Sequence, residues 1–398
     1  MSESGNGGRK GPLAGIRILE LGGVGPGPFA CMLLADLGAE VVRIDRPAGY
    51  DGGAPVDTRF NLLQRGRRSI ALDLKNDAAK QAVLRLVGSA DAVVEGFRPG
   101  VAERLGLGPD ACLEVNPRIV YGRMTGWGQD GPLAEEPGHD INYISLTGVL
   151  HAVGQAGGPP VPPLNLAGDF GGGSLYLVMG ILAALLERQT SGRGQVVDAA
   201  MVDGSASLMT LFYGLFASGY WKDERGVNRL DSGAPWYGVY RTADDRWMSI
   251  GSNEARFWAN ALRVLGLEGE ELPHQHDESG WPELRRLLEE RILTRTRDEW
   301  SALAEGQDAC FTPVLSLTEA PEHPHLVARE TFIDVEGIVQ PAPAPRFSRT
   351  PGAVQNPPPI AGADTDAVLA DWGFDDAEVA RLREVGAIHE AARADPDG

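Results

Sequence analysis

The chain has 398 residues, of which 43% are hydrophobic and 23% charged, and its formal net charge is −19 at pH 7. This length exceeds one ordinary core and predicts two domains, while the acidity disfavours nucleic acid or an anionic membrane as a partner, because both require basic surface. The three cysteines (Cys31, Cys112 and Cys310) are too widely spaced for a disulfide framework or a zinc site, and neither end resembles a targeting signal, so we expect a cytoplasmic protein.

Strand-like and helix-like segments alternate over the first third of the chain. The predicted strands are 16–22, 40–45, 69–74, 91–96 and 118–124, and the predicted helices are 28–39 and 76–90. Such alternation is typical of a parallel sheet with crossover helices. We therefore expect a doubly wound, Rossmann-like α/β domain.

An apolar segment, Leu175–Leu186, continues this domain. It is too short to cross a bilayer of about 30 Å, so we expect a buried core helix and no membrane partner. A short strand over 195–201 and one long helix over 202–221 are predicted to follow it.

The sequence pattern of the next part of the chain predicts a smaller α+β unit that begins near Asp231. Its segment 236–252 has the pattern of a hairpin turning at Asp244 and Asp245, and two amphipathic helices follow over 254–266 and 281–293. A proline-rich connector over 339–360 then leads to two short helices, 363–372 and 375–385. The predicted domains are a large α/β domain (1–200), a linker helix (201–230), a small domain (231–330), and a return linker with C-terminal helices that pack on the large domain (331–398).

Several familiar motifs are incomplete. Gly25, Gly27 and Ala30 fit a dinucleotide-binding G-x-G-x-x-A pattern, but the intervening prolines remove backbone amides that would hold a pyrophosphate, so a plain strand-to-helix turn is favoured. No G-x-S-x-G elbow occurs, which disfavours an α/β-hydrolase. The segments "HQHD" (274–277) and "EHPH" (322–325) lack a third ligand cluster, so no metal site is predicted.

A larger set of motifs carries a specific resemblance. The segments are "GPGP", "LLADLGAEVVRIDRP", "LDLK", "EGFRPGVAERLGLGP", "GRMTGWGQDGP", "GHDINY" and "LAGDFGGGS". Together they closely resemble the family III CoA-transferases (the CaiB-BaiF superfamily), and within that family the branch of alpha-methylacyl-CoA racemase. The resemblance runs from about Pro12 to beyond Phe347.

This resemblance implies an isomerase of lipid and fatty acid metabolism. The family reaction interconverts (2R)- and (2S)-2-methylacyl-CoA thioesters without a cofactor, since coenzyme A is part of the substrate. The family's catalytic residues fall on His139 and Asp169, which exchange the alpha proton, and on Glu254, which orients the histidine. The resemblance also implies an interlocked homodimer in which Glu254 approaches His139 across the subunit interface.

The chemistry of the two bases agrees with this implication. A histidine has a reference pKa of about 6.5, near the optimum for proton transfer at neutral pH, whereas an aspartate at about 3.9 needs burial to become more basic. Neither group deprotonates a carbon acid unaided, so the enolate oxygen requires fixed donors. We expect the amides of Asp169–Gly172, at the start of an apolar helix, to supply them.

Coenzyme A carries three phosphoryl groups, so an acidic protein must gather basic residues locally to bind it. The predicted contacts are Arg46, Leu72, Asp73, Leu74, Lys75, Arg98, Arg104, Gly138, Asp140, Ile141, Asn142 and Tyr143. Asp140 is also expected to bond to local backbone. The basic segment "GRR" (66–68) competes with this set.

Two other functions remain open. Family members that move CoA between carboxylic acids use the aspartate at the position of Asp169 as a nucleophile and pass through an acyl anhydride. They usually have a glycine run near the position of Glu254 and lack the histidine of "GHDINY", so "GSNEARF" and His139 both favour racemisation. A non-catalytic CoA-binding relative is the third hypothesis.

Overall fold

The computed structural model describes residues 8–46 and 57–389. The chain forms two compact units, each assembled from separate segments. Unit 1 comprises Met1–Thr147, Leu164–Leu208 and Ala328–Gly398, and unit 2 comprises Gly148–Pro163 and Met209–Val327. The chain therefore passes between the units more than once.

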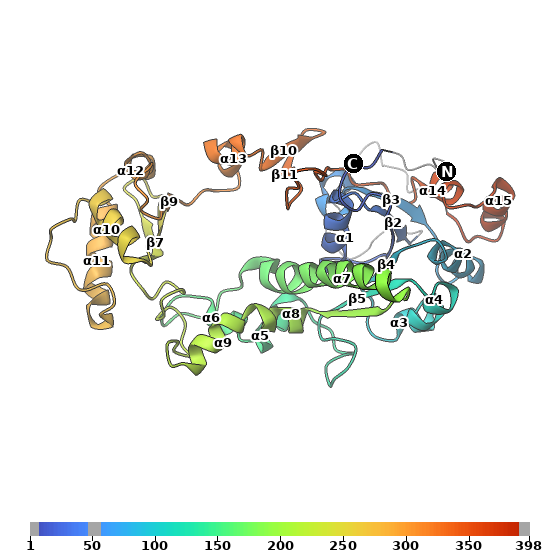
Figure 1. Cartoon of the computed structure of the whole chain (residues 1–398), viewed down its shortest axis with the longest axis horizontal. Coiled ribbons are helices and arrows are strands. Elements are labelled where there is room, and N and C mark those ends of the chain that lie inside the picture. The colour runs from blue at the N-terminus through green and yellow to red at the C-terminus, as the bar shows by residue number, and fades with distance from the viewer. Residues whose placement is uncertain (1–7, 47–56, 390–398) are drawn as a thin grey trace. The chain divides into compact units, whose positions relative to one another are not determined.

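Unit 1 is built on a sheet of six parallel strands in the order β3-β2-β1-β4-β5-β6 (Figure 1). The strands are β1 (Arg17–Leu21), β2 (Glu40–Asp45), β3 (Arg67–Ala71), β4 (Ala92–Glu95), β5 (Val120–Thr125) and β6 (Val196–Ala200). The order reverses between β1 and β4, as it does at the switch point of doubly wound folds. The predicted parallel α/β sheet is thus confirmed, and each strand predicted from the sequence is present.

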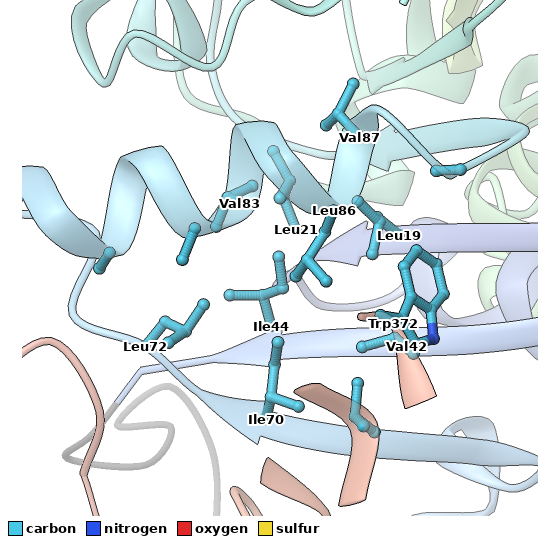
Figure 2. Close-up of a cluster of buried hydrophobic side chains, with 14 of the residues drawn as sticks. Leu19, Leu21, Val42, Ile44, Ile70, Leu72, Val83, Leu86, Val87 and Trp372 are labelled. Carbon is cyan, nitrogen blue, oxygen red and sulfur yellow. The ribbon is translucent and has the colours of Figure 1, made fainter. Parts of the chain in front are cut away.

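Successive side chains of these strands enter two different cores, because a strand alternates its side chains between the two faces of a sheet. Leu19 belongs to a cluster with α2, α4, α14 and α15, whereas its neighbour Ile18 belongs to a cluster with α1 and α7. Figure 2 shows Val83 and Leu86 of α2 beside the strand residues of the first cluster. The helices of the unit are α1 (Pro26–Asp36), α2 (Asp77–Val87), α3 (Val101–Arg104), α4 (Pro109–Val115), α5 (Asp140–Leu146), α7 (Leu175–Ser191), α8 (Met201–Leu208), α14 (Thr365–Asp371) and α15 (Asp376–Glu384).

Helix α7 packs on β5 with one face. Its Leu177 and Ile181 are buried over Gly122, where an added Cβ would come within 2.8 Å of the Leu177 side chain. On the other face, Met179 is 58% and Leu186 68% exposed, so the predicted burial holds for one face only. Among the described residues, Leu164–Ser191 is long and apolar enough to cross a membrane by length and composition, and half of its apolar window is buried as in a core helix.

The single helix predicted over 202–221 is wrong. The structure has two short helices, α8 and α9 (Thr210–Ala217), separated at Met209, which is also the boundary between the units. Gly204 of α8 lies so close to Gly172 that an added Cβ would come within 1.8 Å of the Gly172 carbonyl oxygen. α8 thus packs closely on the segment around Gly172, a contact that periodicity alone does not reveal.

Unit 2 contains an antiparallel sheet in the order β7-β8-β9 covered by three helices. The elements are β7 (Tyr237–Arg241), β8 (Trp247–Gly251), β9 (Phe311–Pro313), α10 (Ala255–Val264), α11 (Trp281–Ile292) and α12 (Arg297–Ala304). The predicted hairpin is confirmed, with Asp245 in its turn at φ 60°. Other elements of the described residues are α6 (Val149–Ala152), α13 (Pro324–Ala328) and the antiparallel pair β10 (Phe332–Val335) and β11 (Ile338–Pro341). β11 overlaps the start of the predicted connector.

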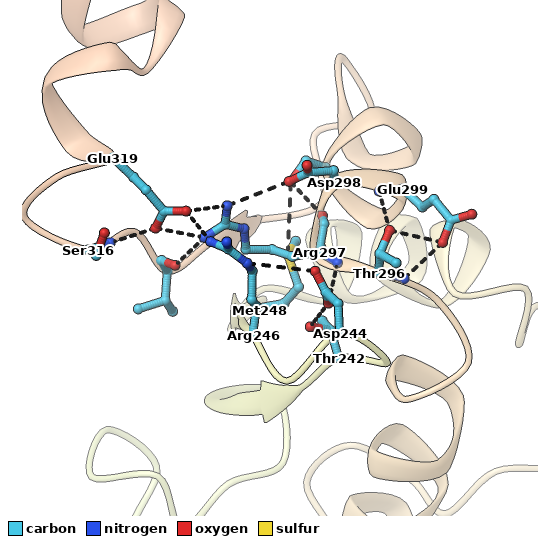
Figure 3. Close-up of polar contacts among 12 residues, drawn as sticks. Thr242, Asp244, Arg246, Met248, Thr296, Arg297, Asp298, Glu299, Ser316 and Glu319 are labelled. Carbon is cyan, nitrogen blue, oxygen red and sulfur yellow. Dashed lines mark hydrogen bonds and ion pairs between the residues drawn. The ribbon is translucent and has the colours of Figure 1, made fainter.

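A polar cluster fixes the segment after β9 to the rest of unit 2 (Figure 3). Glu319 accepts hydrogen bonds from Arg297 Nη2 at 2.8 Å and from the Ser316 backbone N–H at 2.9 Å, and Arg246 also donates to it. The Arg297 hydrogen bond holds the pKa of Glu319 well below its usual range. Asp244 accepts from the Arg297 backbone N–H at 3.1 Å, so the hairpin turn and α12 share this cluster.

Candidate active site

A cavity of about 600 Å³ opens at the carboxyl ends of the strands of unit 1. The last residues of β1, β4 and β5 line it, together with the starts of α1 and α5. Doubly wound sheets bind ligands outside the carboxyl ends of their strands at the switch point, which here lies between β1 and β4. The fold therefore provides a binding site that both "GHDINY" and "NLAGDFGGGS" reach.

His139 lines this cavity from the N-cap position of α5. Its backbone is extended (φ −131°), and Asn142 Oδ1 accepts a hydrogen bond from the His139 backbone N–H at 3.0 Å. A side chain at the third helical position that bonds back to the N-cap is one half of a capping box. Asn142 thus fixes the backbone that carries the imidazole.

Tyr143 packs beside His139 and explains two glycines of the motifs. Its ring meets Trp127 edge-on at 4.8 Å, and its hydroxyl donates to the carbonyl oxygen of Gly138. An added Cβ would lie 2.0 Å from this ring at Gly126 and 2.7 Å from it at Gly138. The two glycines therefore give the tyrosine room to form a wall of the cavity.

Asp169 reaches the same cavity from a π-helical segment, η4 (Ala167–Ser174), that runs directly into α7. Its side chain accepts a hydrogen bond from Asn165 Nδ2 at 2.7 Å on Oδ2. The turn before α1 also approaches it, since an added Cβ at Gly25 (φ 67°) would lie 3.3 Å from Asp169 Oδ2. Glycine is needed here for both the positive φ and the close approach.

Asp140 connects the two motifs directly. It is buried, and its Oδ1 accepts a hydrogen bond from the backbone N–H of Asp169 at 2.7 Å. The carboxylate that follows His139 therefore holds the backbone of Asp169. Asp140 thus bonds to backbone, but to a residue 29 positions away and not to the local backbone that the sequence predicted.

The surroundings make Asp169 more basic than an ordinary aspartate. Burial raises its pKa, the hydrogen bond from Asn165 opposes this, the charge of Asp140 raises the pKa further, and His139 lowers it. Burial and the charge of Asp169 also raise the pKa of Tyr143, which Arg98 lowers. His139 thus acts on the pKa of Asp169, and Asp169 and Arg98 act on the pKa of Tyr143, within a single cavity.

The predicted role of the Asp169 amide is wrong. This N–H donates to Asp140 and is not free to bind an enolate oxygen. The sequence places Asp169 next to glycines at a helix start, but it does not show that another carboxylate occupies that amide. The donor for an enolate oxygen is therefore a group other than this amide.

The predicted CoA contacts fall into three groups. Arg98, Gly138, Asn142 and Tyr143 line the large cavity. Arg46, Leu72 and Leu74 line an adjoining cavity of about 180 Å³ that shares Gly23, Val24, Gly96 and Phe97 with the large one. Asp73, Lys75, Arg104, Asp140 and Ile141 line neither.

Glu254 belongs to unit 2, whereas His139 and Asp169 belong to unit 1. It is exposed and caps the start of α10, with an extended backbone (φ −82°, ψ 142°). Its orienting role remains a prediction.

Sequence reasoning missed Asn165 as a functional residue. It stands four residues before Asp169, but its backbone is non-helical and Asp169 lies in a π-helical segment, so regular helical spacing gave no signal for this contact. It also missed Glu20 and Glu95, two buried carboxylates that line the cavity. Each is paired with a buried arginine, Arg43 at 3.0 Å and Arg123 at 2.9 Å respectively.

Comparisons with known proteins identify the family of the chain. Residues 13–365 match CoA-transferase family III. The chain is 45% identical over 372 residues to the alpha-methylacyl-CoA racemase of Mus musculus and 42% identical over 373 residues to that of Homo sapiens, covering 93% of this chain and 96% of each relative. A solved structure of a CAIB/BAIF family protein from Brucella suis is similar with a TM-score of 0.80 and 26% identity, over 92% of this chain and 100% of that chain. The chain therefore belongs to CoA-transferase family III.

Proposed function

We propose that this chain is an isomerase of lipid metabolism that interconverts (2R)- and (2S)-2-methylacyl-CoA thioesters. The observation that carries the proposal is that His139 and Asp169, an imidazole and a carboxylate from separate elements, line one cavity at the switch point of the sheet. The similarity over nearly the whole chain to proteins named alpha-methylacyl-CoA racemase supports it. The reaction needs no separate cofactor, because coenzyme A is part of the substrate.

The mechanism uses the two bases on opposite faces of the reacting carbon. One base removes the alpha proton and leaves an enolate, and the conjugate acid of the other returns a proton to the opposite face, which inverts the centre. Burial raises the pKa of Asp169, so its carboxylate is a better base, and its protonated form is populated closer to neutral pH. Asn165 holds this carboxylate in place at 2.7 Å.

The CoA part of the substrate is proposed to bind across the two adjoining cavities. Arg98 in the larger cavity and Arg46 in the smaller one supply charge for its phosphoryl groups. Both cavities are lined by Gly23 and Gly96, which have no side chains to separate one cavity from the other. The other residues predicted to contact CoA are proposed to surround the phosphoryl groups bound by Arg98 and Arg46.

CoA transfer between carboxylic acids is the second candidate, since Asp169 is placed to act as a nucleophile as well as a base. Two features favour racemisation over it. His139 supplies the second base that transfer does not need, and the segment around Glu254, "GSNEARF", has no glycine run. A non-catalytic CoA-binding protein would have no use for a buried carboxylate held by Asn165.

One incubation separates the three functions. A single enantiomer of a 2-methylacyl-CoA ester is incubated with the protein in deuterium oxide, with and without an acceptor acid. A racemase incorporates deuterium at the alpha carbon and forms the other enantiomer without an acceptor. Formation of a new thioester only with the acceptor would support transfer, and the absence of both reactions in a protein that binds CoA would leave a binding role.

We also propose that the protein is an interlocked cytoplasmic homodimer without nucleic acid or membrane partners. The assembly would bring Glu254 of the partner subunit to His139, where a carboxylate bonded to one ring nitrogen leaves the other free as a base. The acidic composition supports the absence of polyanionic partners. Sedimentation of the purified chain tests the dimer.

A further inference from the structure

Two arginines among the predicted CoA contacts, Arg98, which lines the larger cavity, and Arg104, which lines neither cavity, lie on one short arc between β4 and β5. The arc leaves β4 at Gly96, turns through Gly100 (φ 78°) and ends in α3, a helix of one turn. A helix this short has little stability of its own, since the first turn is the unfavourable step of helix formation. Another interaction must therefore hold the arc in one conformation.

A buried arginine of the next strand provides that interaction. Arg123 of β5 donates from Nε to Glu95 Oε1 at 2.9 Å, and from Nη1 and Nη2 to the two carboxylate oxygens of Glu103 at 2.7 and 3.3 Å. Glu95 also accepts the Phe97 backbone N–H at 2.6 Å on its second oxygen. We call Glu95, Arg123 and Glu103 the arc clamp, because it holds the arc near both ends.

The net charge of the arc clamp shows whether it could attract the phosphoryl groups of CoA or only position other residues that bind them. Two carboxylates and one guanidinium leave a net charge of −1, and Glu95 lines the cavity proposed for a polyanionic ligand. By Coulomb's law alone, this cluster disfavours phosphoryl groups. The Arg123–Glu95 pair is buried, whereas Glu103 is exposed at the surface. Ion pairs of either kind contribute little net stability, so their geometry is the property that a binding site would use.

We propose that the arc clamp positions Arg98 and Arg104 for coenzyme A, with Arg123 as the positioning residue that joins the two carboxylates. This inference rests on the proposed CoA-thioester function. Without Glu103, Arg123 still neutralises Glu95, but α3 loses its ion pair with β5, and the ligand must do more of the ordering of the two arginines. If the clamp positions the two arginines, loss of Glu103 should weaken CoA binding. If Glu103 acts only through its negative charge, its loss should make CoA binding tighter.

The test compares Glu103→Ala with Glu114→Ala, which removes the same charge from an exposed position on α4. The dissociation constant of free coenzyme A is measured by calorimetric titration, and the saturated rate of alpha-deuterium exchange is measured separately. Glu103→Ala should raise the dissociation constant about tenfold over the control, which corresponds to the ordering of about two side chains. The saturated exchange rate should stay within about twofold of wild type, because a positioning residue for CoA affects binding and leaves His139 and Asp169 in place.

A second comparison excludes a general loss of structure. In the background Arg98→Ala/Arg104→Ala, Glu103→Ala should weaken CoA binding no further, because residues that act as one unit are not additive. If Glu103→Ala does not fold, Glu103→Gln keeps its volume and one acceptor, and it should give a smaller weakening that also vanishes in that background. An unchanged or lower dissociation constant, or full additivity, would overturn the clamp. A wild-type protein that binds CoA without deuterium exchange would instead overturn the racemase function alone.

Discussion

The carboxylate of Asp140 accepts a hydrogen bond from the backbone N–H of Asp169 at 2.7 Å, and this bond joins the two segments that carry the proposed bases. His139 is the residue directly before Asp140, so the bond relates the imidazole to the carboxylate through two short stretches of backbone. The close fit extends to Gly168, where an added Cβ would lie 2.2 Å from Asp140 Oδ1. The separation of the two basic groups thus depends on a contact that neither the imidazole of His139 nor the carboxylate of Asp169 makes itself.

Replacement of Asp140 tests this dependence. Asp140→Ala leaves a buried N–H without an acceptor, which is expected to lower the free energy of unfolding by about 1–3 kcal/mol. It should also slow racemisation by about tenfold or more, since small displacements of a catalytic group are costly. Asp140→Asn keeps an acceptor oxygen and should retain most of the stability. Urea unfolding and chiral product analysis measure both effects, and equal behaviour of the two variants would contradict the role of this bond.

Asn165 is expected to set the acid limb of the pH profile. Its hydrogen bond to Asp169 opposes the rise in the pKa of Asp169 that burial causes, so Asn165→Ala should raise this pKa further. Asp169 must be ionised to act as a base, and activity in that direction is therefore lost as the pH falls through its pKa. The acid limb for the enantiomer whose proton faces Asp169 should move to higher pH.

The control for this shift is Asn260 of α10, far in sequence from Asp169, whose partly buried side chain donates to the Asp308 carbonyl oxygen and accepts from Arg263 Nη1. Asn260→Ala should leave the pH profile of wild type unchanged. An acid limb that stays in place in Asn165→Ala would show that Asp169 is not the group whose ionisation limits this direction.

The sequence predicts most of the fold because the relevant signals are local. The alternating strands around Ile18 and Leu19 and the proline at the start of α1 are visible as patterns. The break at Met209 is not visible as a pattern, and neither is the close contact between Gly204 and Gly172. Likewise, motif resemblance identifies His139 and Asp169 as site residues, whereas the Asp140 bond that occupies the Asp169 amide requires three-dimensional structure.

Removal of one base is expected to uncouple exchange from inversion. In Asp169→Asn, His139 still removes the proton that faces it, so one enantiomer should incorporate deuterium and the other should not. His139→Gln should show the opposite preference. Each variant should lose racemisation by a factor of about 10³, the usual scale for loss of general acid–base catalysis. Mass spectrometry after chiral separation measures the outcome, and exchange of both enantiomers by either variant would contradict a two-base mechanism.

Complementation between inactive subunits tests the cross-subunit role of Glu254. Co-expression of His139→Ala and Glu254→Ala chains with different affinity tags yields mixed dimers. If Glu254 of the partner subunit serves His139, one site of each mixed dimer carries both substitutions and the other carries none. Random pairing makes about half of all dimers mixed, so the preparation should recover about a quarter of the wild-type activity. If Glu254 acts within its own chain, every site carries one substitution, and the mixture should be no more active than its parents.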